Sequence, residues 1–310
     1  MRNCNWLLLL CVVLITNALA DWESPYYQDH PLVGKVYSLN DTAWVSIGEM
    51  HKELLNSQII LLGETHTNAD HHIGQANVIQ YFIDQGESVA LYWEMLPHEG
   101  WEPDKSVGHD LETLLIQLKE QAKGWEWDIY TPILKLSLKH DLPLNGANLT
   151  KQERTNYTQP DECEIIRNQQ KLEFCDALSV EKIDYLKQLI FAAHCEYLPL
   201  EHTDPLVNTQ IAKDAAFALN ITQSRDMDKV ILIAGKNHVR KDIGVPVHLQ
   251  QLGETSNSIA FVAVDPERTH LNDYLKHEFE DQYDYMVFTP SDRNQDPCIE
   301  FAEKLKKFKK

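Results

Sequence analysis

The stretch IILLGETHTNADHH, residues 59–72, contains the transition that decides the fold. Its first four residues have the length and composition of a short buried strand. Gly63 then permits a tight turn or a close backbone approach. A glutamate, an aspartate and three histidines follow within the next ten residues. A buried strand that ends in so many proton acceptors predicts a chemical site at the strand end.

Six short apolar runs have the pattern of buried strands, and amphipathic stretches separate many of them. The strand candidates are residues 59–62, 88–93, 142–147, 230–234, 259–264 and 286–288. Residues 74–85 and 111–119 carry apolar side chains at helical spacing. Alternating strands and helices predict an α/β fold with a mostly parallel sheet and helices on both of its faces.

Residues 151–208 interrupt this alternation. The segment is polar and charged and has no strand-like run, while Ser179 precedes a stretch of helical spacing as an N-cap would. We therefore expect a small all-helical insertion domain, acting as a cap, between two parts of the α/β domain, residues 21–150 and 209–310. A further helix over residues 209–219 would lead back into the sheet.

The first twenty residues have the pattern of a secretory signal peptide. Arg2 precedes an apolar run over residues 7–15, and residues 18–20 (ALA) form a small-x-small cleavage site. Cys11 lies inside the apolar run, without the small residues that precede a lipid-modified cysteine, so no lipid anchor is expected. We expect export to the periplasm or secretion, with a soluble chain that begins at Asp21.

The charge and the cysteines restrict the partners and the compartment. A formal net charge of −19 argues against a nucleic-acid partner. Four cysteines remain after the leader, and an even number in an exported chain permits two disulfides. Cys163 with Cys175 would form a short local bridge. The cysteine spacing fits no zinc motif.

Reactive side chains follow four of the predicted strands. Glu64 and His66 follow the first, Glu94 the second, Asn148 the third, and His238 the strand over residues 230–234. Sites in open α/β sheets form beyond the carboxyl ends of the strands, and parallel strands align these ends along one edge. We therefore expect the four groups of side chains to converge on one crevice.

The set Glu64, His66, Glu94 and His238 suits two kinds of chemistry. It could bind a divalent metal ion and lower the pKa of a bound water. It could instead divide into a general acid and a general base without a metal. In either case the two glutamates can ionise together in a confined cleft only if a cation or an imidazolium lies between them.

Five motifs, in the same order, give the chain a close resemblance to a known family. They are HPLVGK at 30–35; GETH at 63–66 with DHH at 70–72 and Gln75; WEM at 93–95; His194-Cys195 with Gln210 and DAA at 214–216; and GKNHVRKDIGVP at 235–246. Together they resemble the ChaN family of haem-binding, iron-regulated proteins, part of a wider group that includes Tiki and TraB proteins and the erythromycin esterases. The resemblance covers nearly the whole chain after the leader.

The resemblance implies an α/β domain interrupted by a small helical domain, with haem as the ligand. Members of the family are exported in bacteria, are linked to haem or iron uptake, and hold two haems face to face at a dimer interface. It therefore implies a homodimer and, as a partner in uptake, an outer-membrane haem receptor. The sequence departs from the family in lacking a lipobox, which favours a soluble periplasmic protein.

The resemblance also leaves a hydrolytic alternative open. The wider group contains hydrolases that use the equivalents of Glu64, His66, Glu94 and His238, which activate water in the esterases. In the Tiki branch the spacing from Gly63 to His66 is associated with metal-dependent proteolysis. The alternative is a metal-dependent hydrolase of esterase or peptidase type, with the same four residues as candidate metal ligands.

A haem site needs a flat apolar slot, an iron ligand and cations for the propionates. Histidine and tyrosine are both known iron ligands. His194 and Tyr197 lie at positions i and i+3, so one helical face would present both. Tyr130, Tyr157 and Tyr185 remain alternatives.

Arg240, Asp214 and His72 complete the set of candidate cofactor contacts. Arg240 could bind a propionate bidentately, although Asp242 or Asp214 could equally pair with it. His72 lies at the start of the helix that follows the first strand. Adjacent helical residues point about 100° apart, so at most one of His71 and His72 faces the crevice, and the spacing alone does not choose between them.

Overall fold

The computed structural model describes residues 22–103, 109–158, 163–275, 282–299 and 301–302. The predicted signal peptide, residues 1–20, and the predicted start at Asp21 lie outside these ranges. Within the described part of the chain, no helix combines the length and the apolar character that crossing a bilayer requires.

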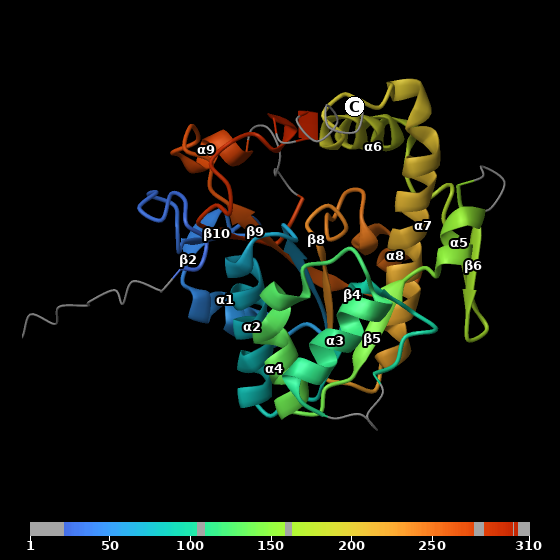
Figure 1. Cartoon of the computed structure of the whole chain (residues 1–310), viewed down its shortest axis with the longest axis horizontal. Coiled ribbons are helices and arrows are strands. Elements are labelled where there is room, and N and C mark those ends of the chain that lie inside the picture. Colours follow the sequence, from blue (N-terminus) through green and yellow to red (C-terminus); the bar gives the residue numbers. More distant parts are fainter. Residues whose placement is uncertain (1–21, 104–108, 159–162, 276–281, 300, 303–310) are drawn as a thin grey trace, which may run out of the picture.

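An eight-stranded sheet forms the centre of the molecule, in the order β2-β1-β10-β9-β3-β8-β4-β5 (Figure 1). Its strands are β1 (Val36–Ser38), β2 (Ala43–Val45), β3 (Ile59–Glu64), β4 (Val89–Pro97), β5 (Leu144–Asn148), β8 (Lys229–Gly235), β9 (Ser256–Ala263) and β10 (Tyr285–Thr289). β1 runs antiparallel to both of its neighbours, whereas the other neighbouring strands are parallel. The prediction of a mostly parallel sheet is confirmed.

Each of the six predicted apolar runs overlaps a strand of this sheet. β1 and β2 were not predicted, because three residues are too few for a periodic pattern to stand out. β1 extends the sheet beyond β10, and β2 follows as its last strand on that side. Neither strand contributes to the predicted site.

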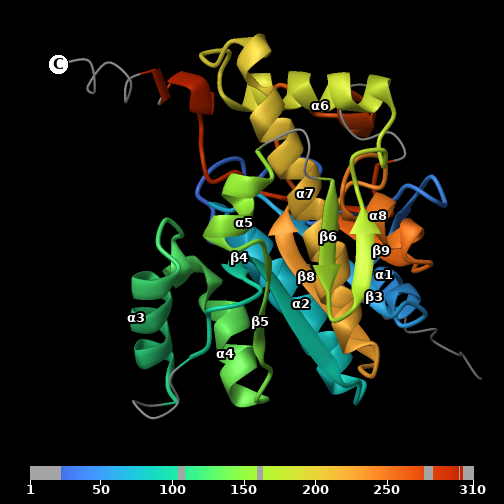
Figure 2. The ribbon, with the colours of Figure 1, turned by 90° about the vertical axis from the view of Figure 1, so that its right-hand side faces the viewer.

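Helices cover both faces of the sheet, as predicted (Figures 1 and 2). Side chains alternate along a strand, so Ile60 and Leu62 of β3 enter one apolar cluster and Ile59 and Leu61 enter the other. The first cluster includes residues of α1 (Ile47–Leu54), α2 (Ala69–Asp84), α3 (Leu111–Gln121), η1 (Trp127–Tyr130) and α4 (Thr131–Lys139). The second includes residues of α7 (Asp204–Ile221), α8 (Val245–Gln251) and α9 (Leu271–Tyr274).

The segment over residues 151–208 is not all-helical, and that prediction is wrong. It contains α5 (Lys151–Asn156), α6 (Val180–Ala193) and η2 (Leu200–His202), but also the antiparallel hairpin of β6 (Glu164–Arg167) and β7 (Gln170–Glu173). Asn168 and Gln169 form the hairpin turn with φ of 48° and 68°, the left-handed conformation that two-residue hairpin turns require. Four-residue polar strands leave no apolar run in the sequence, which is why they were missed.

The helix predicted over residues 209–219 begins earlier, so the expected domain boundary at 208/209 falls inside α7. Pro205 occupies the first turn of α7, where its missing N–H costs nothing. The first half of α7 contributes Val207 and Ile211 to an apolar cluster with β6, β7 and α6, while Phe217 and Ile221 pack against the sheet. The helix therefore joins the inserted segment to the α/β core.

Two disulfides stabilise this part of the chain. Cys163–Cys175, the predicted local bridge, encloses the β6–β7 hairpin. Cys195–Cys298 connects residues 103 positions apart and joins the end of α6 to the C-terminal segment.

Candidate functional site

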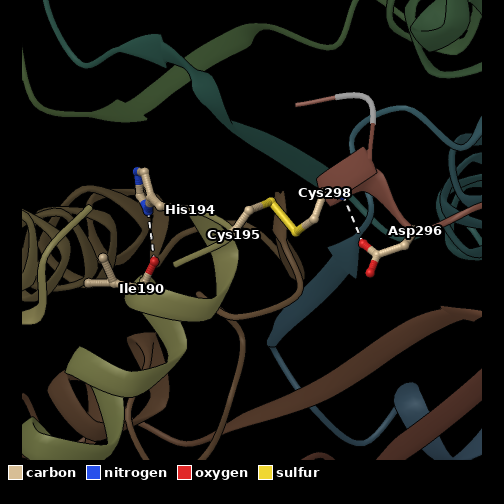
Figure 3. The surroundings of a disulfide bond; sticks show 5 residues. All are labelled: Ile190, His194, Cys195, Asp296 and Cys298. Carbon is tan, nitrogen blue, oxygen red and sulfur yellow. Dashed lines mark hydrogen bonds between the residues drawn. A yellow bond between two sulfur atoms is a disulfide. The ribbon is translucent and has the colours of Figure 1, made fainter. Parts of the chain in front are cut away.

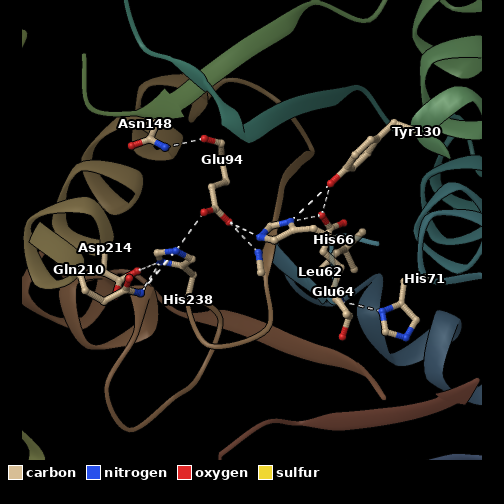
Figure 4. Close-up of polar contacts among 12 residues, drawn as sticks. Leu62, Glu64, His66, His71, Glu94, Tyr130, Asn148, Gln210, Asp214 and His238 are labelled. Atoms are coloured by element: carbon tan, nitrogen blue, oxygen red, sulfur yellow. Dashed lines mark hydrogen bonds and ion pairs between the residues drawn. The ribbon is translucent and has the colours of Figure 1, made fainter. Parts of the chain in front are cut away.

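The sheet order brings the predicted site residues together. β8 lies between β3 and β4, and Glu64 at the end of β3 pairs in register with Gly235 at the end of β8. Glu94 lies on β4, and the loop after β8 carries His238. Figure 4 shows Glu64, His66, Glu94 and His238 around one crevice. The prediction that these four side chains converge is confirmed.

Two glycines make this close arrangement possible. A Cβ on Gly63 would lie 2.3 Å from Val239 Cγ2 and 2.9 Å from Lys236 Cα. A Cβ on Gly235 would lie 3.0 Å from His66 Nε2. The loop after β8 can therefore pack against the end of β3 only because both positions lack a side chain.

The carboxylate of Glu64 is buried and has four partners. Its Oε1 accepts from Tyr130 Oη at 2.6 Å and pairs with His66 Nδ1 at 2.8 Å. Its Oε2 accepts from Gln75 Nε2 at 2.7 Å and lies 3.1 Å from His72 Nδ1. Burial raises the pKa of Glu64, but the charge of His72 and the histidine hydrogen bonds outweigh it and hold the pKa at about 2.

His72 carries a charge that its neighbours require. Its Nε2 faces the main-chain carbonyl of His66 at 3.2 Å, and its Nδ1 faces Gln75 Oε1 as well as Glu64. All three are acceptors, so both ring nitrogens must be protonated. Burial lowers the pKa of His72, but the charge and the hydrogen bond of Glu64 outweigh this effect and raise it above its ordinary value.

His238 forms a second ion-paired group between two carboxylates. Its Nδ1 lies 2.5 Å from Asp214 Oδ1, and its Nε2 lies 3.2 Å from Glu94 Oε1. Glu94 Oε2 also accepts from the Gly235 N–H at 2.8 Å. Burial lowers the pKa of His238, but the two carboxylates outweigh it and raise the pKa to about 9.

The charge of His238 affects the pKa values of Glu94 and Asp214 to different extents. Burial raises the pKa of Glu94, but the charge of His238 outweighs it and brings the pKa far below its ordinary range. Burial raises the pKa of Asp214 to about 6, and the same imidazolium only partly opposes this rise. One cation cannot fully compensate two buried carboxylates.

His66 connects the two groups. Its Nδ1 pairs with Glu64, and its Nε2 lies 3.6 Å from Glu94 Oε2. Carboxylates and imidazoles therefore alternate from Asp214 through His238, Glu94, His66 and Glu64 to His72. The His66 side chain is 34% exposed, whereas its partners in this series are buried. Burial lowers the pKa of His66, but hydrogen bonding and charge from the two glutamates raise it overall.

The structure distinguishes the two adjacent histidines. His72 belongs to the ion-paired series, whereas His71 supports the turn. His71 Nδ1 accepts from the Thr65 N–H at 2.8 Å, so its proton lies on Nε2, which donates to Thr289 Oγ1 at 3.0 Å. Burial lowers the pKa of His71 well below its ordinary value, so this residue is a neutral structural group.

The predicted metal site receives no support from this geometry. Among the residues that the structure describes, no three histidine, cysteine or acidic side chains are arranged to hold a metal ion. Glu64, His66, Glu94 and His238 instead direct their polar atoms at one another, which satisfies each carboxylate with an imidazole.

A pocket of about 380 Å³ opens above this series, within the range of volumes typical of small-molecule sites. Its floor is formed by the strand ends, residues 64–66 and 235–238. Its opposite wall, here called the cap wall, is formed by α6. The residues of the cap wall are Leu186, Leu189, Ile190, Ala193 and His194. The pocket thus combines a charged floor with an apolar wall that ends in a histidine.

His194 has one ring nitrogen engaged and one available. Its Nδ1 lies 2.7 Å from the carbonyl oxygen of Ile190. Because a carbonyl can only accept, the Nδ1 atom carries the proton, and Nε2 of the neutral ring retains its lone pair. A hydrogen bond at one nitrogen is the usual way in which proteins orient a metal-binding histidine.

The remaining cofactor candidates are placed less favourably. Tyr197 does not share a helical face with His194, and that prediction is wrong: α6 ends at Ala193, and Cys195 and Glu196 reverse the chain with φ of 54° and 59°. Arg240 pairs bidentately with Asp242 at 2.9 and 2.6 Å, so Asp242 and not Asp214 is its partner.

The three alternative tyrosines each have a different partner. Tyr130 donates to Glu64, Tyr157 donates to the carbonyl of Glu164 at 3.0 Å, and the Tyr185 ring contacts the Arg240 guanidinium. None of the three lines the pocket below α6.

The sequence did not lead us to predict that Tyr130 and Gln75 form hydrogen bonds with Glu64. Gln75 follows His72 by three residues, which is the helical spacing that brings two side chains to one face, so a signal was present. Tyr130 reaches Glu64 from a 3₁₀ helix 66 residues away, and no sequence pattern indicates that contact.

Comparisons with known proteins identify the family and the fold. A family model described as "Haem-binding uptake, Tiki superfamily, ChaN" matches residues 50–249. A solved structure of ChaN from Campylobacter jejuni, reported for its cofacial haem binding, has a TM-score of 0.64 at 22% identity, covering 81% of this chain and 95% of that one. At this identity the likeness shows a shared fold.

Weaker structural matches complete the comparison. The erythromycin esterase EreC matches with a TM-score of 0.46 at 12% identity, covering 83% of this chain and 97% of that one. The type III effector HopBA1 matches with a TM-score of 0.41 at 12% identity, covering 84% of this chain and 99% of that one. No curated protein sequence matches.

Proposed function

This chain belongs to the ChaN family of haem-binding uptake proteins in the Tiki superfamily, and from this premise we propose that it binds haem in the pocket between α6 and the strand ends. The observation that carries the proposal is His194, which lines the pocket and has its Nδ1 held by Ile190. Its Nε2 is the atom available to ligate the iron. Histidine is an established axial ligand of haem iron.

The chemistry of the pocket fits a porphyrin. Leu186, Leu189, Ile190 and Ala193 offer apolar surface to a flat ring on one side. The opposite side carries His66, whose pKa is raised by the two glutamates and whose side chain is partly exposed, and Lys236. His66 and Lys236 line the pocket and are the basic groups proposed to meet the propionates, whereas Arg240 does not line it and is paired with Asp242. Bound haem would supply the iron chemistry, and the chain would orient and shield it.

Titration of the purified protein with haemin, followed at the Soret band, tests the proposal. We expect a saturable shift at one haemin per chain. His194→Ala should weaken binding by about tenfold or more, since even groups that only orient a metal ligand are worth 10- to 100-fold in affinity. His202→Ala, at an exposed position outside the pocket lining, is the matched control. An unchanged spectrum at stoichiometric haemin would contradict the proposal.

We also propose that the protein is exported and takes part in haem or iron uptake. The leader-like pattern over residues 1–20 supports export, and so do the two disulfides, which persist mainly in oxidising compartments. Cell fractionation and N-terminal sequencing of the mature chain test it. A cytoplasmic protein that retains its first twenty residues would contradict it.

A homodimer is the assembly we propose for the haem-bound state. Tyr197 and Phe301 are 55% and 37% exposed, and their rings lie 5.7 Å apart beside the pocket end of α6. Exposed aromatic side chains are typical of protein–protein contacts. Light scattering with and without haemin tests the dimer. The outer-membrane haem receptor implied by the family resemblance stays a prediction.

A hydrolase is the second candidate, because His66 faces the pocket between Glu64 and Glu94. An imidazole with a carboxylate at each nitrogen can hold and release a proton, as a general acid or base must. Assays with ester and peptide substrates test this candidate, with His66→Ala as the inactive variant. Substrates left intact by the wild-type protein would eliminate it.

A further inference from the structure

The Cys195–Cys298 disulfide adjoins the residue assigned to the iron. Cys195 directly follows His194, and Cys298 belongs to the C-terminal segment that follows β10; Figure 3 shows the bond between them beside His194. The Cys298 N–H donates to Asp296 Oδ1 at 2.8 Å, which orders the local turn on that side of the bond. The disulfide thus connects the tip of the cap wall to a part of the chain outside the cap.

Toward its end, α6 packs against the apolar cluster of the inserted segment through Leu189 and Ile190, which are only half-buried. Leu186 is its one fully buried residue among those that the structure describes, and His194 is exposed. The chain then reverses through Cys195 and Glu196, which both have positive φ. Residues with side chains adopt this left-handed conformation reluctantly, so the reversal needs support from outside the helix. The disulfide supplies that support, along with the contact between the Tyr197 and Phe301 rings.

The hydrogen bonds of this turn connect the disulfide to the imidazole. Cys195 N–H donates to Ala192 O at 2.8 Å, Glu196 N–H donates to Phe191 O at 3.1 Å, and Tyr197 N–H donates to His194 O at 3.1 Å. His194 Nδ1 donates to Ile190 O within the same turn. If the reversal opened, the last turn of α6 would lose these bonds, and the orientation of the His194 ring would be lost with them.

We propose that the Cys195–Cys298 disulfide is a positioning element of the haem site, which holds His194 with its Nε2 toward the pocket. This inference rests on the proposed haem function. The oxidised protein then has a preformed ligand, whereas the reduced protein has a mobile one and binds haem more weakly. The second disulfide, Cys163–Cys175, encloses the hairpin away from the pocket and has no such role.

A pair of matched double variants tests the proposal. Cys195→Ser/Cys298→Ser removes the positioning bond, and Cys163→Ser/Cys175→Ser removes the control bond. We expect the first variant to bind haemin about tenfold or more weakly, within the range found for groups that orient a metal ligand, and to lose the Soret position of the histidine-ligated form. The control variant should keep both affinity and Soret position. Equal behaviour of the two variants would overturn the proposal.

Amide hydrogen exchange separates this proposal from the haem function itself. Without haemin, the amides of residues 194–197 should exchange faster in Cys195→Ser/Cys298→Ser than in the wild type or in the control variant. Unchanged exchange there would refute the positioning role even if haem binds, and a wild-type protein that ignores haemin would refute only the haem function. Should the serine variant not fold, folded wild-type protein opened at this bond by a limiting phosphine reductant, with the site mapped by mass spectrometry, gives the same readings.

Discussion

The two sides of the pocket are held in place by different interactions. On the floor, Glu64, Glu94 and His238 are 2%, 3% and 6% exposed, and each pairs with groups from other strand ends or from the helices that cover the sheet. The cap wall opposite is one face of α6, a helix whose residues are mostly half-buried or exposed. Its end is held by a turn and by a covalent bond to the C-terminal segment.

This difference suggests that the floor contributes mainly to the stability of the fold and the cap wall mainly to ligand binding. A largely buried, ion-paired floor loses stability when one partner is removed, because the lost partner leaves an uncompensated charge. A half-exposed helix can move or lose a side chain at small cost to folding. We therefore expect substitutions on the floor to act mainly on the free energy of unfolding, and substitutions in the cap wall to act mainly on haem affinity.

The largest effect should come from Glu64→Gln. The change leaves the buried His72 imidazolium without its carboxylate, and breaking one side of a buried ion pair costs about 3–5 kcal/mol. Urea unfolding of the purified variant measures the loss. Glu120→Gln, at an exposed position of α3, is the matched control and should change the free energy by less than about 0.5 kcal/mol. Equal losses in the free energy of unfolding for the two variants would contradict the claim that the paired floor stabilises the fold more than a surface position does.

Gly63→Ala should have the next largest effect. The added methyl group would overlap Val239 Cγ2 and the main chain at Lys236, and overpacking of this kind costs about 1–3 kcal/mol. Gly86→Ala is an informative comparison, because nothing lies near its added Cβ and its cost comes only from the positive φ of 82°. Thermal unfolding of both variants distinguishes crowding from backbone strain.

The free energy of unfolding should fall gradually as the pH rises above neutral. The pKa of His238 is about 9 in the folded protein and 6.5 in an ordinary environment. A raised pKa contributes stability that is complete below pH 6.5 and is lost as the pH rises through 9. Asp214, with its pKa of about 6, is already ionised over most of this window.

Unfolding free energies measured from pH 6 to pH 9.5 check this prediction. His238→Asn should reduce the decline without abolishing it, because the pKa values of His66 and His72 are also raised. A wild-type stability that does not fall across this range would mean that the imidazolium of His238 contributes nothing to the floor.

The smallest effect on folding should accompany a clear effect on binding. Leu189 is half-buried in the cap wall, so Leu189→Ala should cost about 1 kcal/mol of stability, below the range for fully buried leucines. Removing its apolar contact with a porphyrin should weaken haemin binding by about tenfold, since burial of a leucine side chain is worth about 1.5–3 kcal/mol. Urea unfolding and haemin titration of the same sample test both parts. A large loss of stability without loss of affinity would reverse the comparison.

The floor was predictable from the sequence, and the cap wall largely was not. Strands such as residues 59–62 and 230–234 are continuous apolar runs, and the rule that parallel strands end at one edge was enough to bring Glu64, Glu94 and His238 together. The inserted segment has no comparable rule. Its hairpin strands are four residues long, and its order depends on two disulfides and on an α7 that starts at Asp204.

The same contrast applies to individual site residues. His194 could be proposed as a ligand from its motif, but its orientation depends on where α6 ends, and helix ends are poorly defined by apolar spacing. Cys195 and Glu196 both adopt positive φ, but neither is a glycine, so the sequence gives no signal of the turn. Tyr197 was placed on the wrong face for that reason. Long-range contacts such as Tyr130 with Glu64 follow only from the assembled fold.

The position of the iron tests the central claim most directly. Anomalous diffraction at the iron edge, from crystals of the haemin-loaded protein, locates that atom without assumptions about the ligand. The account predicts iron bonded to His194 Nε2, between the cap wall and the strand ends. Iron found elsewhere, for example in the larger cleft lined by Trp101, Asn145 and Arg167, would contradict it.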